Sequence, residues 1–210
     1  MAEPAELYDA ILTGNAKKAE EITKAALEAG VDASELLQKY MIPAMDEVGS
    51  RFECNEYFVP ELLIAARAMK TSLELITPNL AAEGAKSSGR VVIGTVQGDL
   101  HDIGKNLVAS MLEGGGFEVV DLGVDVAPDQ FVQAAGEQEG SIVALSALLT
   151  TTMTMMKQVI EALEAAGLRA NTKVIIGGAP ITQQYCDEIG ADGYSDNASA
   201  AVALARKLAE

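Results

Sequence analysis

The chain has 210 residues, 49% of them hydrophobic, which is enough for one large domain or two modest ones with buried cores. Its formal net charge is −16 and both halves are acidic, so binding to nucleic acid or to an anionic membrane is disfavoured, because both need clustered Lys and Arg. Two cysteines make no disulfide framework, no apolar run approaches the ~20 residues of a membrane span, and no signal-peptide pattern opens the chain, so we expect a protein of the reducing cytoplasm.

Residues 1–78 show helical patterns throughout. Asn15 and Asp32 stand where helices should begin, and both are residue types that cap helix N-termini. Pro43 lies inside the helix that Asp32 opens and should kink or break it. The pattern predicts an all-α four-helix bundle over residues 1–78. Residues 79–89 hold Asn, Gly and Ser without an apolar period, which indicates a linker.

From residue 90 the pattern alternates between strands and helices. Five segments are expected as strands, namely RVVIGTV, FEVVDLG, SIVALSA, TKVIIGG and the short ADGYS. Helical segments separate them, which predicts an α/β domain over residues 90–210 with a flavodoxin-like, five-stranded, doubly wound parallel sheet in the order 2-1-3-4-5. In this order the loops after strands 1, 3 and 4 open on one crevice.

The only histidine, His101, falls in the first of these loops, within GDLHDIGKN. The chain lacks a GxGxxG fingerprint, a Walker motif and a GxSxG elbow, and Ser146 stands where a phospho-receiver domain would have an aspartate. One histidine and two distant cysteines cannot build a zinc site. Asp99, two residues before His101, is suited to orient a metal-ligating imidazole, and one protein ligand suffices if a macrocycle supplies the others. Spacing alone leaves a general base or a hydrogen-bonded loop histidine as alternatives.

The stretch DLHDIG resembles the DxHxxG motif of cobalamin-binding proteins. The companion motifs SxL and GG follow in order as Ser146-Ala147-Leu148 and Gly177-Gly178, on the three loops expected to converge. The N-terminal half contains MIPAMDEVGSRFECNEYFVPELLIAARAMK, which is similar to the four-helix cap that precedes this domain in methionine synthase and in small methyl-carrying corrinoid proteins. The resemblance covers nearly the whole chain. It is strongest to the corrinoid subunits of methanol, methylamine, betaine and methoxyarene methyltransferase systems.

The resemblance implies a site for a cobamide, cobalamin or a related corrinoid, bound base-off and His-on. His101 would be the lower axial ligand of cobalt, Asp99 its hydrogen-bond partner and Thr152 the hydroxyl beyond that aspartate. The implied cofactor-binding residues are Gly98, Asp99, His101, Asp102, Ile103, Gly104, Ser146, Leu148, Thr150, Gly177, Gly178, Asn197 and Ala198, with Phe52 and Val59 in the cap.

The implied function is that of a corrinoid protein carrying a methyl group on cobalt between two enzymes. A substrate-specific methyltransferase would load it, and a second methyltransferase would pass the methyl to a thiol or a tetrahydrofolate-type acceptor, with a reductive activation protein as a further partner. The chain would be a carrier subunit and not a stand-alone catalyst, because the cofactor does the chemistry. One alternative is the small cobalamin-binding subunit of a B12-dependent mutase, against which the helical cap argues. The other is a cobalamin-dependent regulator, which would need a basic DNA-binding domain.

Overall fold

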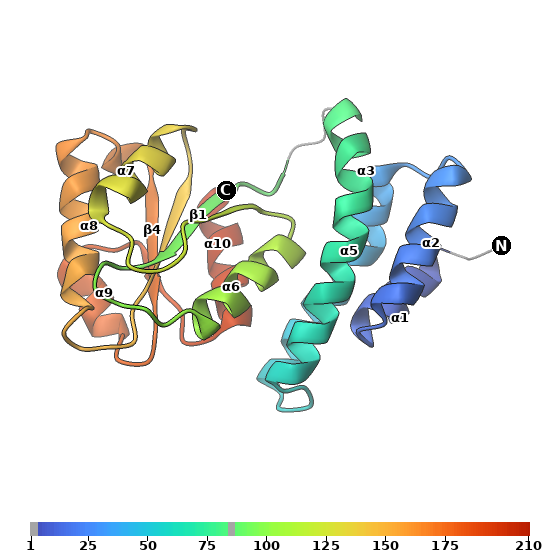
Figure 1. Ribbon diagram of the computed structural model, residues 1–210, viewed down its shortest axis with the longest axis horizontal. Coiled ribbons are helices and arrows are strands. Elements are labelled where there is room, and N and C mark those ends of the chain that lie inside the picture. Colours follow the sequence, from blue (N-terminus) through green and yellow to red (C-terminus); the bar gives the residue numbers. More distant parts are fainter. Residues whose placement is uncertain (1–3, 84–86) are drawn as a thin grey trace. The chain divides into compact units, whose positions relative to one another are not determined.

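The computed structural model describes residues 4–83 and 87–210 (Figure 1). These fall into two compact units, a helical unit containing the N-terminal helices and an α/β unit containing the strands with their helices, and the main division along the chain falls between residues 87 and 88. Of the helices in the described part of the chain, none combines the length and the apolar character needed to cross a membrane.

The helical unit packs around a core of aliphatic and methionine side chains, among them Leu7, Ile11, Met41 and Leu62. Its elements are α1 (Ala5–Leu12), α2 (Ala16–Glu28), α3 (Ala33–Leu36), the π-helical turn η1 (Leu37–Met41), α4 (Ile42–Glu53) and α5 (Val59–Glu83). The predicted caps are confirmed at both α2 and α3. Asn15 Oδ1 accepts a hydrogen bond from the backbone N–H of Lys18 at 3.1 Å, and Asp32 Oδ1 accepts one from the N–H of Glu35 at 2.9 Å.

Pro43 does not break its helix. The chain runs from α3 through η1 into α4, and Pro43 lies in the first turn of α4. A proline has no N–H to donate to the carbonyl four residues earlier, and its ring crowds that carbonyl. The structure meets this crowding with the wider π-helical turn immediately before the proline, which is where the sequence predicted a kink.

Helix α5 extends further than the sequence predicted. Residues 79–83 were assigned to a linker, but α5 continues through Pro78 to Glu83, so that part of the linker prediction is wrong. The proline removes one backbone hydrogen bond, whereas the sequence LAAE that ends the helix consists of strong helix formers. The remainder of the predicted linker includes residues 84–86, which lie outside the described residues.

Replacing Pro78 by alanine should therefore stabilise the protein. Alanine restores the missing N–H and removes the clash with the preceding turn, which together are worth about 3 kcal/mol in an unconstrained helix and less where the turn has already relaxed. Thermal and urea unfolding should show a higher midpoint. Asn79→Ala, at the neighbouring exposed position of α5, is the control and should change the midpoint much less. A lower midpoint in Pro78→Ala would contradict this account.

The α/β unit confirms the predicted sheet. Its strands β1 (Arg90–Thr95), β2 (Glu118–Asp121), β3 (Ile142–Ser146), β4 (Lys173–Gly177) and β5 (Gly193–Tyr194) are all parallel and lie in the order β2-β1-β3-β4-β5. The helices are α6 (Ile103–Gly114), α7 (Pro128–Gly136), α8 (Thr154–Ala165), α9 (Gln183–Ile189) and α10 (Ala198–Ala209), with a short 3₁₀ turn η2 (Arg169–Asn171) before β4.

The two faces of the sheet are packed differently. Figure 1 shows α7, α8 and α9 on one side of the sheet and α6 and α10 on the other. The first face buries bulky side chains such as Val143 and Leu145 against Phe131 of α7 and Met156 of α8. Successive strand residues point to opposite faces, so the second face carries the alternate positions. In register across β1, β3 and β4 these include Ile93, Ala144 and Ile175.

Candidate functional site

The loops after β1, β3 and β4 meet at the carboxyl edge of the sheet and open into a cavity of about 630 Å³. The cavity continues from these loops into the space between the sheet and helices α6 and α10, all within the α/β unit. It is lined by Ile93, Leu100, His101, Asp102, Ile103, Gly104, Lys105, Val108, Ala144, Leu145, Ser146, Ala147, Leu148, Ile175, Ile176, Gly177, Gly178, Ala179, Tyr194, Ser195, Asp196, Asn197 and Ala201.

Small residues account for the depth of this cavity. Ala144, Ser146 and Gly177 lie on the sheet, and Ala201 lies on α10. With short side chains on both layers, the helices and the sheet leave a channel between them. Position 178 requires glycine, because its φ is +131° and a Cβ there would lie 1.9 Å from the carbonyl oxygen of Ala147. Only glycine allows this close approach of the β4 loop to the β3 loop.

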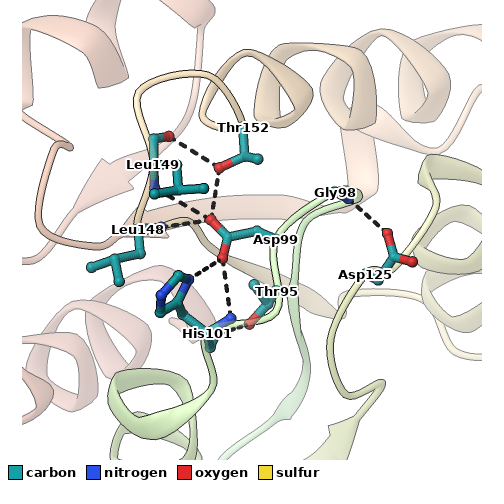
Figure 2. A network of polar contacts seen from close by, with 8 residues as sticks. All are labelled: Thr95, Gly98, Asp99, His101, Asp125, Leu148, Leu149 and Thr152. Atoms are coloured by element: carbon teal, nitrogen blue, oxygen red, sulfur yellow. Dashed lines mark hydrogen bonds and ion pairs between the residues drawn. The ribbon is translucent and has the colours of Figure 1, made fainter.

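Asp99 is the centre of the polar network at the mouth of the cavity (Figure 2). Its side chain is completely buried. Oδ2 accepts hydrogen bonds from the Thr152 hydroxyl at 2.7 Å and from the backbone N–H groups of Leu148 at 2.8 Å and Leu149 at 3.3 Å. Oδ1 accepts one from the backbone N–H of His101 at 3.1 Å. The carboxylate thus joins the loop after β1 to the loop after β3.

The His101 ring rests on the same carboxylate. Its Nδ1 lies 2.8 Å from Asp99 Oδ1, and the hydroxyl of Thr95, at the end of β1, donates to the His101 carbonyl oxygen at 2.8 Å. The His101 side chain is 54% exposed. A carboxylate on Nδ1 favours the tautomer whose proton sits there, which leaves the lone pair on Nε2. The ring is therefore held by one nitrogen and can use the other as a ligand.

Hydrogen bonding decides the charge of Asp99. Burial alone would raise the pKa of this carboxyl, but the hydrogen bonds from Thr152, from the Leu148 N–H and from His101 outweigh it and hold the pKa well below its usual range. The group is ionised at neutral pH. Since the pKa is lowered in the folded state, the stability it contributes is present above the ordinary aspartate pKa of about 3.9 and is lost as the pH falls below it.

Apolar side chains surround the exposed imidazole. Leu100 is 71% exposed, Ile103 81%, Leu148 41% and Leu149 43%, and the first three line the cavity. Large aliphatic side chains this exposed in one place are typical of a surface that binds an apolar partner or ligand. Among the residues that the structure describes, no three His, Cys, Asp or Glu side chains gather to hold a metal ion by themselves.

The structure brings most of the predicted site residues together. Those that line the cavity are His101, Asp102, Ile103, Gly104, Ser146, Leu148, Gly177, Gly178 and Asn197. Asp99 bonds to His101 and Thr152 behind the exposed imidazole ring. The Gly98 N–H donates a hydrogen bond to Asp125. Thr150 is exposed and Ala198 is buried at the start of α10, and neither is among the lining residues. Asn197 also caps α10 by accepting a hydrogen bond from the N–H of Ala200 at 2.8 Å.

Two of the predicted residues belong to the helical unit. Phe52 lies near the end of α4 and Val59 at the start of α5, where Val59 is 40% exposed. Three further large side chains of this region are also exposed, namely Phe58, Leu63 and Ile64. The helical unit thus has an exposed apolar surface of its own. The roles of Phe52 and Val59 stay a prediction.

Sequence reasoning missed several lining residues, including Ile93, Val108, Ala144, Ile175, Tyr194 and Ala201. Alternation along β3 separates Ala144 from its bulkier neighbours Val143 and Leu145, but it does not show that Ala144 lines a cavity. Lys105 was also missed. It is 3% exposed, and its Nζ donates to Asp121 Oδ2 and to Asn106 Oδ1, so that a buried cation ties the first turn of α6 to the end of β2.

Two models of known protein families match this chain, over separate stretches. A family model described as a B12 binding domain matches residues 89–203. A second model with the same description matches residues 5–77.

Curated relatives match over nearly their whole length. Trimethylamine corrinoid protein 1 of Methanosarcina acetivorans is 46% identical over 206 residues, which make up 97% of this chain and 95% of that protein. Dimethylamine corrinoid protein 3 of the same organism is 43% identical over 203 residues, with coverage of 97% and 95%.

Solved structures show the same fold. A cobalamin-binding protein from Desulfitobacterium hafniense aligns with a TM-score of 0.79 at 34% identity and covers 99% of both chains. The methanol:cobalamin methyltransferase complex of Methanosarcina barkeri contains a chain that aligns with a TM-score of 0.84 at 30% identity, with coverage of 97% of this chain and 78% of that one.

Proposed function

This chain belongs to the corrinoid proteins with a B12 binding domain, and on that premise we propose that it carries a methyl group on the cobalt of a cobamide between two methyltransferases. The names of its relatives, trimethylamine and dimethylamine corrinoid proteins, make methylated amines the first methyl donors to test. Their coverage of 97% of this chain supports a carrier over the mutase-subunit and regulator alternatives. When bound, the cobamide supplies the cobalt that accepts and releases the methyl group.

The proposal depends mainly on one observation, the deep cavity with His101 at its mouth. A cobamide bound base-off needs a channel for its nucleotide tail and a nitrogen ligand above that channel. The cavity of about 630 Å³ runs between the sheet and two helices and is lined by Ala144, Ser146, Gly177 and Ala201, which fits a rod-like tail. The Nε2 of His101 is available as the ligand, because Asp99 engages Nδ1. The residues present therefore fit the group.

Each residue of the mouth has a separate task in this proposal. His101 would offer the lone pair of its Nε2 to the cobalt, while Asp99 holds the ring and its tautomer. Thr152 and the Leu148 N–H in turn hold Asp99. The exposed apolar side chains of Leu100, Ile103 and Leu148 line the cavity and would keep water away from the bound macrocycle. Helix α6 begins at Ile103 and Gly104, and a Cβ at Gly104 would meet no atom within 4 Å, so its glycine leaves room at the mouth.

The helical unit acts as the cap of the reduced cofactor in this proposal. Phe52 and Val59 would be its contact residues. The partners are a substrate-specific methyltransferase, a second methyltransferase that accepts the methyl group, and a reductive activation protein, all working in the cytoplasm. Loading the purified protein with a cobamide, reducing the cobalt to Co(I) with a chemical reductant, and supplying candidate methyltransferases with trimethylamine, dimethylamine or methanol tests this directly. A carrier yields one methyl group per bound cobamide, and a protein that binds no cobamide contradicts the proposal.

Filling the channel should weaken cobamide binding. Ala201 is 1% exposed and lines the cavity, whereas Ala203, two residues along the same helix, is exposed. A leucine at 201 would take the space of the tail, and overpacking of this kind costs about 1–3 kcal/mol, or about 5- to 150-fold in affinity. Titration of the cofactor-free protein with cobamide measures this affinity.

The control is Ala203→Leu, which adds the same side chain outside the channel and should bind as tightly as the wild type. Thermal unfolding without cofactor shows whether both variants are folded. Equal cobamide affinity for Ala201→Leu and Ala203→Leu would mean that the tail does not occupy this cavity.

A further inference from the structure

The loop between β2 and α7 runs beside the residues that lead into His101. The N–H of Thr95 donates to the Gly123 carbonyl at 2.9 Å, and the N–H of Val126 donates to the Thr95 carbonyl at 3.0 Å. Val96 and Val126 form an isolated parallel bridge. Residues 123–126 thus extend the sheet past the end of β1, along the start of the histidine loop.

Asp125 makes the last two contacts of this extension. Its Oδ1 accepts a hydrogen bond from the backbone N–H of Gly98 at 2.7 Å, and its own N–H donates to the carbonyl oxygen of Asp99 at 3.0 Å. Figure 2 shows the first of these, on the side of the loop opposite to Thr152. Asp125 therefore holds the backbone at the N–H of Gly98 and at the carbonyl of Asp99, one contact on each side of the Asp99 Cα.

The backbone of Asp125 is unusual. Its φ is +54°, and in the described part of the chain Asn55 is the only other non-glycine residue with a positive φ. L-residues rarely adopt this conformation, and Asp and Asn tolerate it best. The position requires two properties at once, namely a short side chain with an oxygen that can reach Gly98 and a backbone that accepts a positive φ. Aspartate and asparagine have both.

We propose that Asp125 is a positioning residue for the cofactor ligand, which aims the Asp99 carboxylate, and through it the His101 ring, by fixing the backbone of Gly98 and Asp99. The side chain of Asp99 is held from the β3 side by Thr152 and Leu148. Its main chain is held from the β2 side by Asp125. A carboxylate clamped at only one end would be free to tilt, and the His101 ring would tilt with it. The effect on cobalt ligation rests on the proposed function, but the positioning itself is a property of the cofactor-free protein.

Two substitutions distinguish the effect of the Asp125 side-chain oxygen from the effect of the positive φ at this position. Asp125→Asn keeps an oxygen acceptor and tolerates the positive φ, so it should behave like the wild type. Asp125→Gly adopts the positive φ without difficulty but has no acceptor for the Gly98 N–H. The difference between these two variants isolates the Asp125–Gly98 hydrogen bond.

The experiment uses the full chain without cofactor, labelled with ¹⁵N. The Gly98 amide should exchange with solvent about 3- to 10-fold faster in Asp125→Gly than in the wild type, which is the fold-change that one hydrogen bond produces. In Asp125→Asn it should stay within about 2-fold. The ¹⁵N signals of the His101 ring should shift or broaden in Asp125→Gly and return to their wild-type positions in Asp125→Asn.

The same variants are then loaded with cobamide, and histidine nitrogen coupling to cobalt is measured. A smaller His101-ligated fraction in Asp125→Gly, with recovery in Asp125→Asn, supports the proposal. Unchanged His101 ring signals in Asp125→Gly, or equal changes in both variants, would overturn it. If the wild type shows no histidine nitrogen on cobalt while the cofactor-free contrast holds, the proposed function fails and the positioning role of Asp125 stands.

Discussion

Replacing His101 by alanine should leave a folded protein that still binds cobamide but no longer ligates its cobalt. The ring is half exposed and makes its contact through Nδ1, while the backbone N–H of residue 101 keeps its bond to Asp99 in the variant. The channel is untouched, so tail binding should remain. Loss of an orienting partner already costs about 10- to 100-fold in metal affinity or activity, and loss of the ligand itself should reduce methyl transfer by at least about 100-fold.

The sequence makes this measurement unusually clean. His101 is the only histidine among 210 residues, so ¹⁵N-histidine labels one side chain when the protein is purified without a histidine tag. Nitrogen coupling to the cobalt should appear in the wild type and vanish in His101→Ala. Leu100→Ala, which changes the exposed neighbour, is the control and should retain the coupling. A nucleotide base on cobalt in the wild type would contradict His-on binding.

The sheet could be predicted from the sequence because its signals are local. Each strand is a short apolar run, each is followed by a helical segment, and parallel strands with short connections allow few orders. The predicted order is confirmed strand by strand. The place where three motif-bearing loops meet follows from that order, and it is the mouth of the observed cavity.

The depth of the cavity could not be predicted in the same way. Ala144 and Ala201 look in sequence like ordinary core alanines. That they line a channel depends on how far α10 stands from the sheet, which is a tertiary property. The length of α5 was missed for a related reason, because Pro78 is a strong local signal that the rest of the helix overrides.

The hydrogen-bond donors to Asp99 could be predicted only in part from the sequence. A hydroxyl at Thr152 could be predicted from the resemblance, but the N–H groups of Leu148 and Leu149 are backbone donors that any residue would supply. Asp125 carried no signal at all. Its contact depends on a positive φ in the loop after β2, and the sequence around it gives no indication of that conformation.

Asp99→Asn should show how far the availability of the His101 Nε2 lone pair for cobalt depends on the Asp99 carboxylate. Two backbone N–H groups, of Leu148 and Leu149, donate to the Oδ2 position, and one, of His101, donates to the Oδ1 position. We expect the single amide oxygen of asparagine to turn toward the larger set, so that the His101 N–H loses its acceptor. The NH₂ group then faces His101, whose Nδ1 can bond to it only as an acceptor. The ring proton moves to Nε2, and the lone pair needed by the cobalt is lost. We expect a folded variant that binds cobamide but whose histidine ligation is weakened about 10- to 100-fold.

Two measurements check this reasoning separately. The ¹⁵N shifts of the single histidine in cofactor-free protein report the tautomer, which should change from Nδ1–H to Nε2–H in Asp99→Asn. Nitrogen coupling in the loaded protein reports the ligation. Thr152→Ser is the matched control, because it keeps the hydroxyl that donates to Asp99 Oδ2 and should leave both readouts as in the wild type. Asp99→Asn could instead keep the proton on Nδ1 and ligate cobalt as well as the wild type. The negative charge of Asp99 would then not be what keeps the Nε2 lone pair of His101 available, and the backbone placement of the ring alone would account for it.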